Sequence, residues 1–198
     1  MKLLKCILLI AFCFHSAKSI EQTPAPAASA DIYMQLKKLN VLGSVLYIAA
    51  HPDDENNGLL PYLAKEKLYR TGYLSLTRGD GGQNLIGPEQ GIELGMIRTH
   101  ELLAARRIDG AEQFFSRAYE FGFSKSSAEA LRIWDHDKIL SDVVWVIRQY
   151  QPDVIIKRFP PDARAGHGHH AASSILADEA FVAAADPKKF PEQFKYGV

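Results

Sequence analysis

One histidine and three carboxylates directly follow a short apolar run near residue 50, and this stretch is the strongest constraint on the fold. Val45-Leu46-Tyr47-Ile48 is typical of a buried strand, and the chain then continues as Ala49-Ala50-His51-Pro52-Asp53-Asp54-Glu55. Because Pro52 cannot donate to a sheet ladder, the strand should stop beside it and a loop should begin. Three carboxylates so close together cost free energy unless a positive charge lies among them.

Two interpretations of this loop are open. In the first, His51 and Asp54 bind a divalent metal ion, and one carboxylate is left for proton transfer. In the second, Asp53 or Asp54 caps a helix that begins at about Glu55, where the helix dipole favours acidic residues. The two interpretations are compatible with each other, and the loop alone does not decide between them.

The first 19 residues, Met1–Ser19, have the pattern of a secretory signal peptide. Lys2 and Lys5 precede an apolar core at 6–14, and small residues allow cleavage after Ser19. The apolar core is too short to span a membrane comfortably. Both cysteines fall in this leader, so the mature chain would have none. We therefore expect an exported protein, periplasmic or extracellular, that is stable without disulfides.

The charge of the mature chain excludes some classes of function. The full chain has 23 basic and 23 acidic residues, and loss of Lys2, Lys5 and Lys18 with the leader leaves a net charge of −3. This balance argues against nonspecific binding to nucleic acid and gives no attraction to an anionic membrane. Residues 20–30 are typical of a flexible spacer, and residues 31–198 make up one domain.

Strand and helix patterns alternate along this domain. Strands are expected at 45–50, 72–77, 111–115 and 153–159, and helices at 57–69, 89–108, 137–150 and 171–185. The segment with Phe121, Phe123 and Trp134 is expected to be a loop that packs on the domain. The alternation predicts an α/β fold: a Rossmann-like, mostly parallel sheet with helices on both faces.

Ligands of open α/β sheets bind at the carboxyl ends of the strands. Three of the expected strands end in polar loops, at 51–55, 78–84 and 159–170. The third loop ends in His167-Gly168-His169-His170, which holds three of the seven histidines. Together with the first loop it can supply two imidazoles and one carboxylate to a metal ion, with open positions for water and substrate.

The pairing of Ala50-His51-Pro52-Asp53-Asp54-Glu55 with His167-Gly168-His169-His170 resembles the LmbE/PIG-L family of metal-dependent N-deacetylases. The resemblance runs from about Val45 to the end of the chain and includes segments at 77–84 and 98–101. It implies that His51, Asp54 and His170 bind Zn²⁺, or another divalent ion such as Fe²⁺. It also implies that Asp53 is the general base and that His167 stabilises the oxyanion or protonates the leaving amine.

Several positions stay open within this resemblance. Gly79–Gly82 form a tight turn, or they place Asp80 or Asn84 at the mouth of the substrate site. Arg98 is a solvated charge, a partner of Glu101, or a substrate contact. Many family members have Pro-Asp between the two histidines where this chain has Gly168-His169. If that Asp orients the catalytic imidazole, a substitute is needed here, and Asp162 is a candidate.

The expected function is hydrolytic removal of an acetyl group from an N-acetylated amino sugar or glycoconjugate by metal-activated water. The alternatives are another amide hydrolase on the same centre, a mononuclear Fe(II) oxygenase, or a noncatalytic carbohydrate-binding module. The partner would be a small sugar substrate, without nucleic acid and without stable membrane insertion after leader cleavage.

The sequence ends soon after the last expected helix. Asp186-Pro187 and Pro191 interrupt the remaining segment, and no strand pattern comes after them. We expect the domain to continue beyond residue 198, which would leave an unpaired sheet edge or an apolar patch near the C-terminus. The alternative is that the tail packs as a closing helix on a complete sheet.

Overall fold

The computed structural model describes residues 28–198, so the predicted signal peptide and most of the predicted spacer lie outside the described residues. The chain divides into two units between Tyr33 and Met34. Helix α2, Ser29–Lys38, spans this division and begins inside the predicted spacer. Within the described part of the chain, none of the helices has the length and hydropathy needed to cross a membrane.

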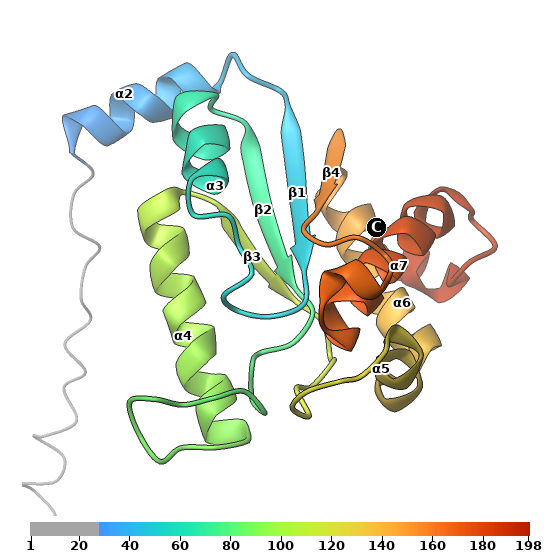
Figure 1. Ribbon diagram of the computed structural model, residues 1–198. Coiled ribbons are helices and arrows are strands. Elements are labelled where there is room, and N and C mark those ends of the chain that lie inside the picture. Colours follow the sequence, from blue (N-terminus) through green and yellow to red (C-terminus); the bar gives the residue numbers. More distant parts are fainter. Residues whose placement is uncertain (1–27) are drawn as a thin grey trace, which may run out of the picture. The chain divides into compact units, whose positions relative to one another are not determined.

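Four parallel strands form the sheet of the second unit, in the order β3-β2-β1-β4 (Figure 1). In the centre, Tyr47 of β1 pairs with Tyr73 of β2 on one side and with Ile156 of β4 on the other. The predicted α/β fold with a parallel sheet is therefore confirmed. The strand bounds are β1 Ser44–Ala49, β2 Arg70–Ser75, β3 Glu112–Phe115 and β4 Val154–Lys157.

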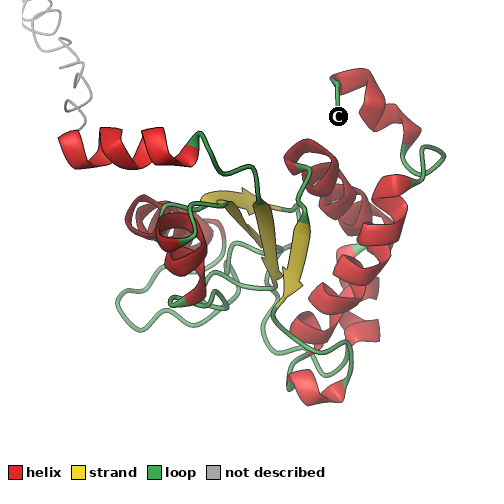
Figure 2. Ribbon diagram, turned by 90° about the horizontal axis from the view of Figure 1, so that it is seen from above, coloured by secondary structure: helices red, strands yellow, loops and turns green. Residues whose placement is uncertain are grey.

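Helices cover both faces of this sheet (Figures 1 and 2). On one face lie α3, Leu59–Pro61, which continues as the π-helical turn η1, Tyr62–Glu66, and α4, Ile92–Asp109. The other face carries α5, Ser127–Trp134, α6, His136–Tyr150, and α7, Gly168–Ala185. Two short 3₁₀ turns complete the unit: η2, Ala163–Ala165, and η3, Pro191–Tyr196.

Alternate residues of the central strands build two separate cores. Leu46 and Ile48 of β1 pack with α5, α6 and α7, whereas Tyr47 and Ala49 pack toward α3 and α4. Successive side chains of a strand point to opposite faces, so a strand covered on both faces must be apolar throughout. All six residues of β1 are accordingly buried, and the loop after this strand starts from a fixed position.

Helix α5 corrects the expectation that residues 116–136 form only a loop. The N–H of Glu129 donates to the Ser126 hydroxyl at 3.2 Å, and the Glu129 carboxylate accepts from the N–H of Lys125 at 2.8 Å. This is close to a capping box, and the Ser-x-x-Glu spacing was the signal that the sequence offered. Trp134 ends this helix and is buried, so its expected packing role is confirmed.

The helix-cap interpretation of the acidic loop is wrong. The helix expected from about Glu55 begins at Leu59. The Asn56 side-chain oxygen accepts from the N–H of Leu59 at 2.9 Å. Because Asn56 satisfies this end of the helix, neither Asp53 nor Asp54 is its cap.

A buried arginine fixes the far end of α7. The Arg148 guanidinium donates to the carbonyl oxygens of Ala184 at 3.2 Å, Asp186 at 3.0 Å and Lys189 at 2.8 Å. It also donates to the side chain of Gln193 at 3.0 Å. Within the described residues no carboxylate pairs with Arg148, and the carbonyls at the negative end of the α7 dipole take that place. The tail after α7 is thereby fastened to α6.

We predict that Arg148→Met lowers the free energy of unfolding by about 3 kcal/mol, because buried carbonyls would lose a charged donor. Urea unfolding of the full chain measures this difference. The matched control is Arg164→Met, which removes an exposed guanidinium paired with Asp162 and should change stability by less than about 0.5 kcal/mol. Equal stability of the two variants would contradict the role given to Arg148.

Candidate metal centre

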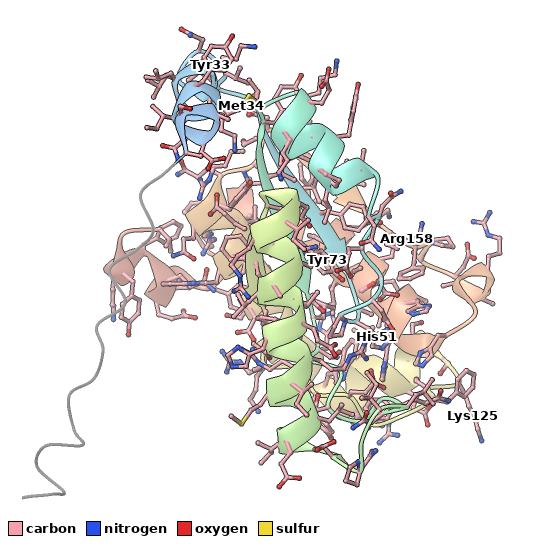
Figure 3. All side chains as sticks on the ribbon, turned by 90° about the vertical axis from the view of Figure 1, so that its left-hand side faces the viewer. Tyr33, Met34, His51, Tyr73, Lys125 and Arg158 are labelled. Atoms are coloured by element: carbon pink, nitrogen blue, oxygen red, sulfur yellow. The ribbon has the colours of Figure 1, made fainter. Side chains whose placement is uncertain are left out.

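The loops that follow β1 and β4 meet at the carboxyl ends of these strands. His51 Nδ1 lies 3.2 Å from Asp54 Oδ2, and His170 Nε2 lies 3.5 Å from Asp54 Oδ1. One ligand atom from each of the three residues lies within 4.8 Å of the others. Figure 3 shows His51 beyond the end of the sheet, below Tyr73 of β2, whose hydroxyl donates to the His51 carbonyl. The structure thus brings together the three predicted ligands.

Neighbouring groups orient each of these three side chains. His170 Nδ1 lies 3.1 Å from the carbonyl oxygen of Ala165. Since a carbonyl only accepts, Nδ1 carries the proton and Nε2 keeps its lone pair toward Asp54. Asp54 Oδ2 accepts from the backbone N–H of His51 at 2.7 Å, and Phe159 stacks on the His170 ring at 3.8 Å. A divalent metal ion requires ligand lone pairs that neighbouring groups hold in place. His51, Asp54 and His170 meet this requirement.

Each carboxylate of the loop has its own positive partner. Asp54 faces His51, Asp53 lies 3.1 Å from Arg98, and Glu55 lies 3.3 Å from Arg106. Helix α4 supplies both arginines. These pairings remove the repulsion that the sequence implied.

The negative groups around His51 favour a proton on its ring. Burial alone would lower the pKa of His51, but hydrogen bonds to Asp54 and Glu120 outweigh it and raise the pKa to about 9. Burial also opposes the charge on Asp54, yet His51 lowers the pKa of that carboxyl below its ordinary value. A divalent ion would occupy the same negative surroundings that favour a proton here.

Asp53 stands apart from the predicted ligands. Its side chain is 69% exposed, whereas that of Asp54 is 10% exposed. The Arg98 guanidinium holds the Asp53 carboxylate from the side of α4. Water can therefore reach Asp53, and this carboxylate is free of the cluster formed by His51, Asp54 and His170.

His167 lies against the same cluster. Its ring centroid is 5.3 Å from that of His51 and 5.0 Å from that of His170. His167 Nδ1 accepts from the backbone N–H of His169 at 3.1 Å and so caps α7, which leaves the proton of the neutral ring on Nε2. Burial, followed by the nearby imidazoles, lowers the pKa of His167 to about 4. Gly168 is needed in this turn, because a Cβ there would lie 2.2 Å from Ser124 Oγ.

His51 also belongs to a second group of side chains that could hold an ion, together with Glu120, His167 and His169, and Glu120 and His169 were not among the predicted site residues. Glu120 Oε2 lies 2.7 Å from His51 Nε2, and Glu120 Oε1 lies 3.3 Å from His169 Nδ1. His169 was marked by its place in the cluster of three histidines and by its departure from the usual family pattern. Glu120 lies outside every motif, so nothing in the sequence marked it. Hydrogen bonds from the two histidines overcome burial and lower the pKa of Glu120 well below its usual range.

The glycine-rich segment after β2 packs against the same region. A Cβ on Gly79, whose φ is +68°, would lie 2.7 Å from Arg98 Nη1, and one on Gly81 would lie 2.2 Å from the Glu120 carbonyl oxygen. Asp80 Oδ1 accepts from the N–H of Glu120 at 3.0 Å. The glycines therefore do more than turn the chain, because they let it close on Arg98 and Glu120. A substrate contact by Asp80 or Arg98 stays a prediction.

Asp162 is not the substitute partner of His167. Its carboxylate accepts from the Arg164 guanidinium at 2.7 Å and from the Arg164 N–H at 3.0 Å. The exposed Phe123 ring lies 5.0 Å from His167 instead.

Comparisons with known proteins fit this geometry. No protein of curated function matches the chain. A solved structure of N,N'-diacetylchitobiose deacetylase from Pyrococcus horikoshii is 19% identical with a TM-score of 0.60, covering 88% of this chain and 66% of that one. The 4-carboxy-2-hydroxymuconate hydratase GalB from Pseudomonas putida is 21% identical with a TM-score of 0.55, covering 75% and 59%. At these low identities the structural likeness shows a shared fold. The chain spans less than two thirds of the length of either protein.

The family described as PIG-L, GlcNAc-PI de-N-acetylase, matches residues 46–181. This range begins in β1 and ends in α7, so it includes both histidine loops and the segment of Glu120. Since it covers well over half of the 198 residues, the chain belongs to the PIG-L family of de-N-acetylases.

Proposed function

We propose that this protein is an exported, metal-dependent hydrolase that removes the acetyl group from an N-acetylated amino sugar or glycoconjugate. The observation that carries the proposal is the division of roles in one loop. Asp54 converges with His51 and His170, whereas Asp53 stays exposed beside them. Membership of the PIG-L family and the likeness to a chitobiose deacetylase support a deacetylase-type reaction.

His51, Asp54 and His170 would hold the ion. Two imidazoles and one carboxylate suit Zn²⁺ and leave room for further ligands, and the same donors also suit Fe²⁺. When bound, such an ion lowers the pKa of a water molecule and polarises an amide carbonyl.

The protein's own groups move the protons. The Asp53 carboxylate accepts the proton of the attacking water, and the Arg98 guanidinium keeps that carboxylate in place. His167 presents Nε2–H to the reacting amide, because its Nδ1 is occupied by the N–H of His169. From this position the neutral imidazole can stabilise the oxyanion through its N–H. The Asp53 carboxyl, which has taken the proton of the attacking water, can return that proton to the leaving amine.

The substrate would extend along the glycine-rich segment. A hollow of about 420 Å³ is lined there by Arg98, Glu101, Asn84 and the exposed Leu85 and Ile86. Its volume falls in the range of small-molecule sites. A noncatalytic carbohydrate-binding module does not need an exposed carboxylate beside the metal centre, whereas a hydrolase needs one for proton transfer. The position of Asp53 therefore favours the enzyme.

The direct test is release of acetate from a panel of N-acetylated monosaccharides and disaccharides by the Zn²⁺-loaded full chain. We expect release from at least one sugar, loss of release after chelation, and recovery when Zn²⁺ is restored. Sugar binding without acetate release from any member would favour the binding module.

We predict that the protein binds one divalent ion per chain and that His170→Phe weakens binding by more than about 100-fold, the upper range for an outer-shell partner. Chelator competition with Zn²⁺ measures the affinity. His169→Phe is the matched control, since it also keeps an aromatic ring, and it should cost less than His170→Phe. The opposite order would make His169 the third ligand.

Asp53→Asn should lower kcat by roughly 10² to 10⁴ while metal content stays near that of the wild type. Asp54→Asn should lose the metal, because a ligand is removed. His167→Ala should resemble Asp53→Asn. Steady-state kinetics and metal analysis on the same preparations test the division. Equal metal loss in Asp53→Asn and Asp54→Asn would refute it.

Gly79→Ala should lower turnover by displacing Arg98 from Asp53, since the added Cβ would meet Arg98 Nη1 at 2.7 Å. Gly110→Ala is the control: it has a similar positive φ of +83°, at the end of α4, but only ordinary contacts. Both should cost roughly 1 to 2 kcal/mol of stability, because a Cβ is disfavoured at positive φ. Equal turnover in the two variants would show that Arg98 does not act on Asp53.

A further inference from the structure

The two nitrogens of His51 face different groups. Nδ1 faces Asp54, within the three-residue cluster, and Nε2 faces Glu120 Oε2 at 2.7 Å. His51 Nε2 also lies 3.1 Å from His169 Nδ1, and Glu120 offers a separate oxygen to each of these two nitrogens. A metal ion at Nδ1 would displace the proton from that nitrogen, so the imidazole would keep one proton on Nε2, where Glu120 accepts it. The groups that hold Glu120 in place therefore bear on the metal centre.

Glu120 is buried, and both of its carboxylate oxygens have hydrogen-bonding partners. Its side chain is 5% exposed, and Oε2 accepts from His51. Oε1 lies 3.1 Å from the N–H of Gly122, which donates to it, and 3.3 Å from His169 Nδ1. The Asp80 carboxylate accepts a hydrogen bond from the backbone N–H of Glu120. The carboxylate thus reaches His51 from a loop after β3, while His51 itself follows β1.

The surroundings of His169 favour a hydrogen bond to Glu120 over ligation of a metal ion. Its ring is fully buried, 4.6 Å from Trp134 and 4.4 Å from Phe121. Its Nε2 has no partner among the described residues. Ligation of a metal through Nδ1 would force the proton onto Nε2, where the aromatic rings leave an unsatisfied N–H. A proton on Nδ1, donated to Glu120, avoids this cost.

We propose that Glu120 is a positioning residue that keeps the proton of His51 on Nε2 and turns Nδ1 toward Asp54 and His170. His169 steadies the carboxylate as its second imidazole donor. The inference rests on the metal-binding part of the proposed function. A carboxylate behind a ligating histidine typically contributes 10- to 100-fold to metal affinity or activity.

The test compares Glu120→Gln with Glu55→Gln in the full chain. Glu55 is a carboxylate of similar burial that pairs with Arg106 and not with His51. Urea unfolding first establishes that both variants are folded. Chelator competition then gives the Zn²⁺ affinity, and ¹⁵N-histidine NMR of the Zn²⁺-loaded proteins identifies the protonated nitrogen of His51 and its exchange rate with solvent.

We expect Glu120→Gln to weaken Zn²⁺ binding by about 10- to 100-fold, and Glu55→Gln to change it by less than threefold. The His51 Nε2–H should exchange slowly in the wild type and much faster in Glu120→Gln. This exchange rate is a property that a merely structural role of Glu120 would leave unchanged.

Three results would overturn the proposal. The first is Zn²⁺ binding by Glu120→Gln with wild-type affinity and an unchanged Nε2–H. The second is a wild type that binds two ions and a Glu120→Gln variant that binds one, which would make Glu120 a ligand. The third is equal loss of affinity in Glu55→Gln. A wild type that binds Zn²⁺ as expected but releases no acetate would refute the deacetylase function and leave this inference standing.

Discussion

The separate pairing of the three carboxylates after β1 is the interaction on which the site depends. Asp53, Asp54 and Glu55 are adjacent in sequence, yet their side chains differ in solvent exposure. Each pairs with a different residue: Asp53 with Arg98, Asp54 with His51, and Glu55 with Arg106. Arg98 and Arg106 are eight residues apart on α4, close to the same face of the helix. With His51 beside Asp54, this helix therefore separates a run of like charges into an exposed carboxylate, a candidate metal ligand and a structural ion pair.

Much of this arrangement was predictable from the sequence. A strand buried on both faces must be apolar, and polar residues at its end then lie at the sheet edge where ligands bind. His51, Asp54 and His170 could be placed together for that reason. The pairing of Glu120 with His51 and of Arg98 with Asp53 could not be predicted, because both residues reach the loop through tertiary packing that no periodic pattern records. Helix α5 was missed because it is short and follows a polar segment, although Ser126 and Glu129 marked its start.

Helix α7 is the frame that holds the centre. Its first turn carries His169 and His170, His167 caps it, and Gly168 packs against Ser124. Its last carbonyls are fixed by Arg148 of α6. A helix held at both ends leaves little freedom for the histidines at its start, so the apolar packing of α5, α6 and α7 is also what aligns the imidazoles.

The sequence separation within the candidate metal centre would link metal binding to folding. His51 and His169 are 118 residues apart and meet only when β1 and β4 pair and α7 docks. An unfolded chain does not present this arrangement, so an ion that binds there favours the folded state by mass action. At a free concentration 100 times its dissociation constant, such an ion adds about 2.7 kcal/mol to stability. In a compartment poor in free metal, the folded protein would therefore have a lower free energy of unfolding.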